Sequence, residues 1–158
     1  MTRLNNGDAF PTLTLDTVLD GAFSVTHHLS GLYGVVLMYR GSWCPYCNAQ
    51  LAAFARAKQK FDELGIKIVA LSVDDNAAAA TLVEKHRLNF PVGYGVDAEK
   101  ISAATGAYVN DSPRYLQSTG FVVDPGGKVI TAVYSSGAIG RLLPDDVIGF
   151  VGYVKSKT

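Results

Sequence analysis

Two short apolar runs, separated by a segment with helical periodicity, constrain the fold of this chain more than any other feature. Gly34–Arg40 reads Gly-Val-Val-Leu-Met-Tyr-Arg, and Ile66–Val73 reads Ile-Lys-Ile-Val-Ala-Leu-Ser-Val. Runs of this length and β-branched content are typical of strands that are buried inside a sheet. The segment between them must therefore connect one buried strand to the next.

Between the two runs, the sequence predicts one helix that begins near Pro45 and stops at Gly65. Proline is accepted in the first helical turn because its missing N–H has no partner there, and glycine is a common stop. The residues that share one apolar stripe of this helix are Cys47, Leu51, Phe54, Phe61 and Leu64. Residues 34–73 are thus predicted to form a β-α-β unit.

The rest of the chain continues this alternation. Further helices are expected at Asn76–Arg87, at about Ala98–Thr105 and at about Pro144–Lys155, with a short strand near Pro91–Gly95. Two strand-like runs, Phe121–Asp124 and Val129–Tyr134, flank a Pro-Gly-Gly turn and predict a β-hairpin. Leu13–Val25 is expected to add a small accessory hairpin. The predicted fold is α/β and thioredoxin-like, with a central mixed sheet flanked by helices and an N-terminal β-hairpin extension.

The length, charge balance and apolar runs of the chain limit its number of domains and its classes of partner. A chain of 158 residues suits a single domain over residues 1–158, and its 14 basic residues balance its 14 acidic residues. Nucleic-acid-binding proteins usually carry an excess of basic charge, so this balance gives no sign of such a partner. The N-terminus lacks the apolar core of a signal peptide, and no apolar run approaches the roughly 18 residues of a membrane span. We therefore expect a cytoplasmic protein without a membrane or nucleic-acid partner.

The chain contains only two cysteines, Cys44 and Cys47, and they lie where the first buried strand meets its helix. In a reducing cytosol a close cysteine pair is more often catalytic or metal-binding than structural. The free N–H groups and the positive end of the helix dipole stabilise a thiolate at Cys44, which we expect to be the nucleophile. Cys47 lies one turn later on the same helix face and is the expected resolving thiol.

The cysteine pair is also compatible with a structural disulfide, a metal site or a non-enzymatic redox module. A disulfide that closes a loop of about four residues contributes only about 2 kcal/mol, so a purely structural bridge is disfavoured. A closed zinc site needs four ligands, and besides the cysteines only His27, His28 and His86 offer imidazoles. We expect these histidines to be solvated. A redox-sensing module without turnover remains the non-enzymatic alternative.

The residues around the cysteines are candidates for supporting roles. Arg40 directly precedes the motif and can stabilise a thiolate or a reacting oxygen, whereas its simplest role is that of a solvated strand-end charge. Trp43, Pro45 and Tyr46 are expected to contact the substrate, the two aromatic side chains as an apolar collar beside the sulfur, although large aromatic residues also serve plain packing.

Several segments in sequence order carry a resemblance to a known family. They are residues 7–11 (Gly-Asp-Ala-Phe-Pro), Asp74, the stretch 88–109, residues 120–128, and Arg40–Cys47 (Arg-Gly-Ser-Trp-Cys-Pro-Tyr-Cys). Together they resemble the AhpC/TSA, or peroxiredoxin-like, branch of the thioredoxin superfamily over nearly the whole chain. The tetrapeptide Cys-Pro-Tyr-Cys is also the active-site motif of glutaredoxins.

The resemblance implies a thiol-dependent oxidoreductase that reduces hydroperoxides or protein disulfides. It also implies that thioredoxin, glutaredoxin or glutathione supplies the electrons, and it implies neither a metal nor a bound organic cofactor. We expect a monomer or a weak homodimer.

The chain departs from the Pro-x-x-x-Thr-x-x-Cys pattern of typical peroxiredoxins. With Cys47 as the cysteine of that pattern, Arg40 and Cys44 replace the proline and the threonine. The second arginine that the family places before the closing hairpin is absent, and Arg114 is the nearest candidate to replace it. Ser118 occupies the position at which thioredoxins and glutaredoxins carry a proline that faces the dithiol. The sequence leaves a role for Arg114 and Ser118 open.

Overall fold

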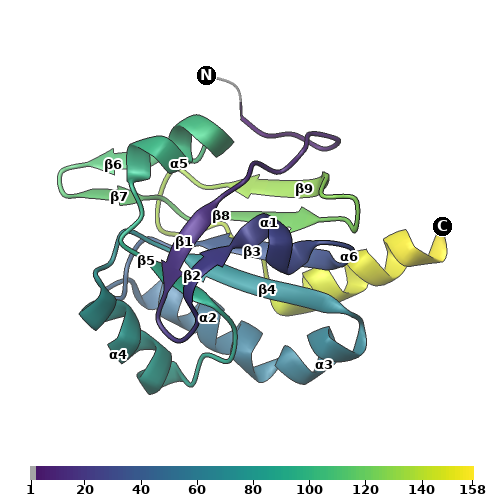
Figure 1. The fold of residues 1–158 in the computed structure, drawn as a ribbon, viewed down its shortest axis with the longest axis horizontal. Helices are drawn as coiled ribbons and strands as arrows, with labels where there is room; N and C mark the ends of the chain where they lie inside the picture. The colour runs from purple at the N-terminus through teal and green to yellow at the C-terminus, as the bar shows by residue number, and fades with distance from the viewer. Residues whose placement is uncertain (1–2) are drawn as a thin grey trace.

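Seven strands form the central sheet of the protein (Figure 1). The structure is a computed structural model that describes residues 3–158. The strands are β1 (Thr14–Thr17), β2 (Gly21–Ser24), β3 (Tyr33–Met38), β4 (Ile66–Leu71), β5 (Val92–Tyr94), β8 (Thr119–Val123) and β9 (Val129–Tyr134). Their order across the sheet is β2-β1-β5-β4-β3-β8-β9.

The centre of the sheet is parallel and its two sides are antiparallel. β3, β4 and β5 run in the same direction, whereas β8 runs against β3 and β1 runs against β5. Val36 of β3 pairs with Val69 of β4 and with Phe121 of β8. All six residues of β3 are buried, as expected for a central strand that is covered on both faces. The mixed sheet that the sequence predicts is confirmed.

Helices cover both faces of the sheet, and the sheet separates two apolar cores. The helices on one face are α2 (Pro45–Arg56), α3 (Lys58–Glu63), α4 (Asn76–His86) and α6 (Pro144–Ser156); those on the other face are α1 (Val25–Leu29) and α5 (Ala98–Thr105). Side chains of a strand alternate between the faces, so Val35 and Leu37 join the first core while Val36 and Met38 join the second.

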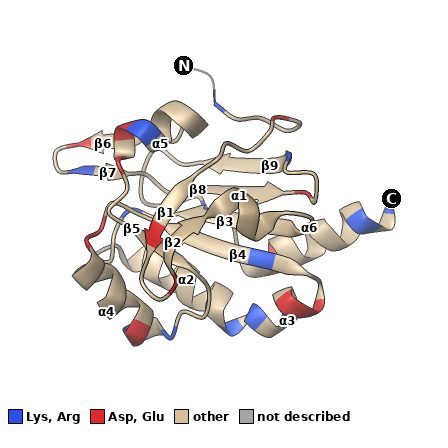
Figure 2. Ribbon diagram, in the orientation of Figure 1, with Lys and Arg blue, Asp and Glu red and all other residues tan. Residues whose placement is uncertain are grey.

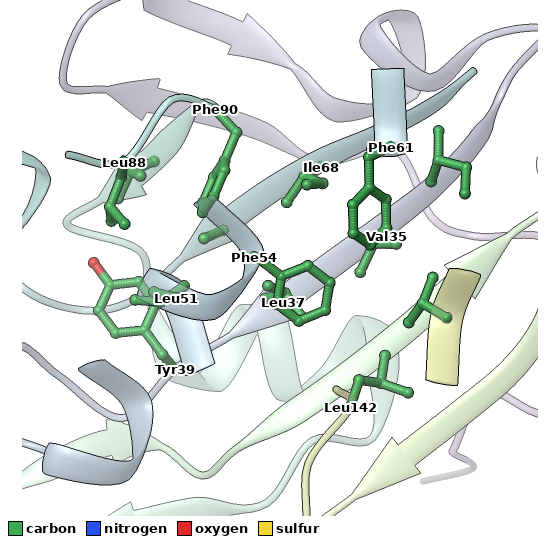
Figure 3. Packing of buried hydrophobic residues seen from close by; sticks show 14 of the residues in the cluster. Val35, Leu37, Tyr39, Leu51, Phe54, Phe61, Ile68, Leu88, Phe90 and Leu142 are labelled. Atoms are coloured by element: carbon green, nitrogen blue, oxygen red, sulfur yellow. The ribbon is translucent and has the colours of Figure 1, made fainter. Parts of the chain in front are cut away.

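Figure 3 shows the first core, where side chains of α2 and α3 lie over the strands. Leu51 and Phe54 of α2 are fully buried, and the ring of Phe54 lies 5.4 Å from that of Phe61 in α3. Leu37 of β3 belongs to the same cluster. This packing fixes the position of α2 on the sheet, and therefore the position of its first turn.

The helix predicted from Pro45 to Leu64 is two helices, so that prediction was wrong in one respect. The Ala57 N–H donates to the carbonyl oxygens of both Ala53 (3.1 Å) and Phe54 (3.2 Å), so a tighter bond three residues back is added to the regular helical bond at this junction. No proline or glycine marks this break in the sequence. The predicted stop at Gly65 is confirmed, since its φ of +70° is a left-handed conformation that glycine adopts without strain.

The N-terminal hairpin is confirmed, but it is not a separate accessory element. β1 pairs with β2 and also with β5, through Asp16 opposite Tyr94, so the hairpin extends the main sheet. A second, two-stranded sheet was not predicted; it consists of β6 (Val109–Asp111) and β7 (Arg114–Leu116). α1 was not predicted either.

Charged residues are spread over the helices and loops that surround the sheet (Figure 2). In the described part of the chain, no helix has both the length and the apolar character needed to cross a membrane.

Candidate redox site

The two cysteines lie at the start of α2, next to the carboxyl end of β3. Cys44 is the N-cap residue, in extended conformation, and its Sγ accepts a hydrogen bond from the Cys47 N–H at 3.2 Å. Pro45 occupies the first helical turn, as predicted. The two thiols are free and buried, with no exposed surface on either residue. The predicted placement of the pair at a helix N-terminus is confirmed.

Hydrogen bonds and a positive charge act on the Cys44 sulfur. Burial alone raises the pKa of this thiol, but hydrogen bonds from the side chain and the N–H of Cys47 lower it. The guanidinium of Arg40, with Nη1 3.8 Å from Cys44 Sγ, lowers it further, and so does the charge of Arg141. The net effect is a Cys44 pKa below the ordinary cysteine value.

The Cys47 thiol has a pKa above the ordinary cysteine value. Burial raises the pKa of Cys47, and the hydrogen bond that its thiol donates to Cys44 raises it further. The Arg40 backbone N–H, 3.4 Å from Cys47 Sγ, and the charge of Arg141 oppose this rise without cancelling it. In the reduced pair, therefore, Cys44 is the thiol that loses its proton more readily than Cys47.

Arg40 is held in place by residues at the end of β7. Its Nε donates to Gln117 Oε1 at 3.0 Å, and its Nη2 donates to Tyr115 Oη at 2.9 Å. The guanidinium carbon lies 5.0 Å from the ring centre of Trp43 and 5.2 Å from that of Tyr115, and the two rings meet edge to face. A guanidinium held by two hydrogen bonds and packed near two rings keeps its direction toward the sulfur. Sequence reasoning missed both Tyr115 and Gln117.

A second arginine, Arg141, reaches the other sulfur and was also missed. Its Nη2 lies 3.7 Å from Cys47 Sγ and 2.6 Å from the carbonyl oxygen of Ala138. Its Nη1 donates to Gln50 Oε1 at 2.8 Å. Gln50 is itself buried and donates through Nε2 to the carbonyl oxygen of Leu142 at 2.9 Å. In the sequence Arg141 stands in a loop before the last helix, where no motif singles it out.

The loop before Cys44 is fixed by polar contacts of its own. The Ser42 N–H donates to Asp74 Oδ2 at 2.8 Å, and Asn48 Nδ2 donates to the Ser42 carbonyl oxygen at 3.0 Å. Burial raises the pKa of Asp74 above its ordinary value despite these bonds. Gly41 lies under the indole of Trp43, and a Cβ there would come within 2.2 Å of the indole nitrogen. A larger residue at this position would therefore require the Trp43 indole to move.

The predicted contact residues lie at the surface around Cys44. Trp43 and Tyr46 are 54% and 52% exposed, and Pro45 is exposed as well. Arg114 does not take part, because its guanidinium pairs with the carboxylates of Glu99 and Asp111. The ion pairs give no support to Arg114 as the substitute for the missing arginine.

Ser118 directly precedes β8 and is buried. Its carbonyl oxygen accepts a hydrogen bond from the Ser135 N–H at 3.0 Å. His27 is exposed as predicted, but His28 and His86 are partly buried, and burial lowers the pKa of His28. Within residues 3–158, no group of three or more histidine, cysteine or acidic side chains is placed to hold a metal ion.

Comparison with known proteins identifies the family of this chain. The model of the AhpC/TSA family matches residues 6–132. The chain belongs to the AhpC/TSA family. A peroxiredoxin of Treponema denticola is 28% identical over 145 residues, which cover 89% of this chain and 69% of that protein. The thiol-disulfide oxidoreductase ResA of Bacillus cereus is 30% identical over 102 residues, which cover 63% of this chain and 54% of that protein.

Among solved structures, peroxidoxin BcpB of Mycobacterium tuberculosis superimposes with a TM-score of 0.83 at 18% identity. The match covers 96% of this chain and 99% of that one. The protein thus has the thioredoxin-like fold of peroxiredoxins. As a member of this family it is a thiol-dependent oxidoreductase of the peroxiredoxin type.

Proposed function

We propose that the protein reduces hydroperoxides by cycling Cys44 and Cys47 between the dithiol and the disulfide. The observation that carries this proposal is the set of donors around Cys44 Sγ, namely the Cys47 N–H and the Arg40 guanidinium at the start of α2. A thiolate is the nucleophilic form of cysteine, and these donors stabilise it. The same guanidinium can also hold the peroxide oxygen that departs.

The cycle starts with attack of the Cys44 thiolate on the terminal oxygen of the peroxide. An S–O bond forms, the O–O bond breaks, and the alkoxide leaves with a proton from solvent as an alcohol or water. Cys47 then attacks the sulfenic acid at Cys44, the S–O bond breaks, and water leaves as the disulfide forms. Because the cysteines are three residues apart on one helix, this second step needs no contact with another chain.

An external thiol returns the pair to the dithiol, and we propose thioredoxin, glutaredoxin or glutathione as its source. The reductant has to approach Cys44, where Trp43, Pro45 and Tyr46 form the exposed surroundings. Neither sulfur has exposed surface in the dithiol form, so a covering side chain has to move before any reactant reaches Cys44.

Anaerobic stopped-flow oxidation of the reduced protein tests this proposal. Trp43 is the only tryptophan and precedes Cys44, so its fluorescence is expected to report the reaction. With hydrogen peroxide, the rate constant is expected to exceed that of free cysteine at the same pH by at least about 100-fold. In the Cys47→Ser variant a sulfenic acid should accumulate at Cys44. Oxidation at the rate of free cysteine would contradict a peroxidase function.

A second candidate substrate is a protein disulfide. The half-exposed rings of Trp43 and Tyr46 favour it, because a polypeptide can pack on such apolar surface whereas hydrogen peroxide gains nothing from it. The relation to ResA, named a thiol-disulfide oxidoreductase, points the same way. Reduction of insulin disulfides separates the two: the peroxidase proposal predicts slow insulin reduction and fast peroxide oxidation, and the reverse ranking supports the second candidate.

A further inference from the structure

Each sulfur of the pair is contacted by the guanidinium of a different arginine, and different residues hold the two guanidinium groups. Arg40 Nη1 lies 3.8 Å from Cys44 Sγ, and Arg141 Nη2 lies 3.7 Å from Cys47 Sγ. Arg40 is held by Tyr115 and Gln117, at the end of β7. Arg141 is held by Gln50 of α2 and by the Ala138 carbonyl oxygen in the loop that precedes α6.

We propose that the two arginines serve different steps of the cycle: Arg40 serves the attack of Cys44 on the oxidant, and Arg141 serves the steps in which Cys47 acts as a thiolate, which are disulfide closure and disulfide reduction. This inference rests on the proposed peroxide-reducing cycle. Arg141 would thus be a catalytic residue of the reductive half-reaction, and Gln50 the residue that positions it.

The reduction step shows why a charge is needed at Cys47. A thiolate of the reductant attacks Cys44 Sγ, a new S–S bond forms, and the bond between Cys44 and Cys47 breaks. The bonding electron pair leaves on Cys47 Sγ, which becomes a thiolate inside the protein. A second reductant thiolate then attacks the reductant sulfur of this mixed disulfide and releases the Cys44 thiolate, while Cys47 takes a proton from solvent. Thiol-disulfide exchange is faster when the leaving thiolate is more stable, and Arg141 supplies that stability.

The surroundings of the two sulfurs direct the reductant to Cys44. Cys44 is flanked by the exposed residues Trp43, Pro45 and Tyr46. The Cys47 sulfur, by contrast, faces the backbone N–H of Arg40 and the guanidinium of Arg141. Cys47 is therefore the leaving sulfur. During oxidation the same charge favours the Cys47 thiolate that closes the disulfide.

Gln50 gives Arg141 a fixed direction. The residue is 4% exposed, and its side chain uses both ends: Oε1 accepts from Arg141 and Nε2 donates to the Leu142 carbonyl oxygen. Rotation of the amide would break both bonds inside the protein, which is costly for buried polar groups. Gln50→Leu should therefore weaken the effect of Arg141 while the charge remains.

The test measures the half-reactions separately by stopped flow, with hydrogen peroxide as oxidant and glutathione or dithiothreitol as reductant. Arg141→Met is expected to slow reduction of the disulfide by about 10-fold and to shift the pH profile of disulfide closure to higher pH. Arg40→Met should instead slow the peroxide step more than the reduction step. Arg141→Lys keeps the charge and should recover part of the reduction rate. It also provides the test if Arg141→Met does not fold.

Arg56→Met is the matched control, because Arg56 is an exposed arginine in the last turn of α2. It should change neither half-reaction. If Arg141→Met slows the peroxide step and the reduction step equally, or slows neither, the division of roles is wrong while the peroxide-reducing cycle stands. If the wild-type protein reacts with peroxide no faster than free cysteine, the cycle itself fails, and this outcome is seen before any arginine variant is made.

Discussion

The first turn of α2 and the rest of that helix differ in what their side chains contact. In the first turn, the sulfurs of Cys44 and Cys47 meet N–H groups and two guanidinium groups. In the later turns, Leu51 and Phe54 are buried in the apolar core against the sheet (Figure 3). The first turn of α2 therefore determines reactivity, and its later turns contribute to stability. A substitution in one part should have only a limited effect on the property that depends on the other part.

Removal of the Cys44 thiol is expected to have the largest effect on activity and almost none on stability. Cys44→Ser deletes the nucleophile, so peroxide consumption should fall to the background rate. Serine is a favoured N-cap residue and can accept the Cys47 N–H in place of the sulfur. Peroxide consumption and thermal unfolding measured on the same sample check this. A variant that keeps activity would transfer the nucleophile to Cys47.

The opposite result is expected at the far end of the helix. Phe54→Ala leaves a cavity beside Phe61 and should lower the free energy of unfolding by about 3–5 kcal/mol. The rate constant of the folded fraction with peroxide should stay close to that of the wild type. Urea unfolding and stopped-flow oxidation, each at a temperature where the variant is folded, measure the two quantities. A large loss of rate in fully folded protein would show that the halves of α2 are coupled.

A smaller effect is expected from the residue that orients Arg40. Tyr115→Phe removes the hydroxyl that accepts from Arg40 Nη2 but keeps the ring against Trp43. Hydrogen bonds to charged groups contribute about 1.5–3 kcal/mol, of which Gln117 retains a share, so oxidation by peroxide should slow by about 3- to 10-fold. Gln117→Leu is the companion variant. An unchanged rate in the double variant would mean that the direction of Arg40 does not matter.

The smallest effect concerns the loop before Cys44. Burial raises the pKa of Asp74, so its carboxylate destabilises the folded state at neutral pH, and this penalty disappears once the group is protonated at low pH. Asp74→Asn keeps an acceptor for the Ser42 N–H and should raise the free energy of unfolding by less than about 1 kcal/mol at pH 7, given solvent screening. The gain should shrink as the pH falls through the raised pKa of Asp74 and vanish below the ordinary pKa of aspartate. A loss of stability at pH 7 would mean that the charge strengthens the bond to Ser42 by more than burial costs.

Much of the fold follows from local patterns. The two buried strands around α2, the hairpin of β8 and β9, and the helices α4, α5 and α6 were predicted because periodicity and turn residues mark them in a short window of sequence. The break at Ala57 was not predictable, because it depends on a bifurcated hydrogen bond rather than on proline or glycine. β6 and β7, at three residues each, are too short for a pattern to show.

The site could be predicted only where it is local in sequence. Cys44, Cys47 and Arg40 are neighbours in the chain and were recognised together, and the structure places them together. Arg141 lies 94 residues beyond Cys47 and reaches it only after α6 and its preceding loop pack against α2. The burial of both sulfurs likewise depends on the packing of distant elements around the start of α2. The single-domain organisation, the oligomeric state and the roles of Trp43 and Tyr46 stay predictions.

The pH dependence of alkylation at Cys44 tests the central claim most directly. In the Cys47→Ser variant, whose hydroxyl can still donate to the sulfur, the iodoacetamide reaction should be half-maximal below the ordinary cysteine pKa of about 8.5. Adding Arg40→Met should move this midpoint upward, toward the ordinary value. A midpoint at or above 8.5 in Cys47→Ser, or faster alkylation at neutral pH of Cys47 in the Cys44→Ser variant, would contradict the assignment of Cys44 as the stabilised thiolate.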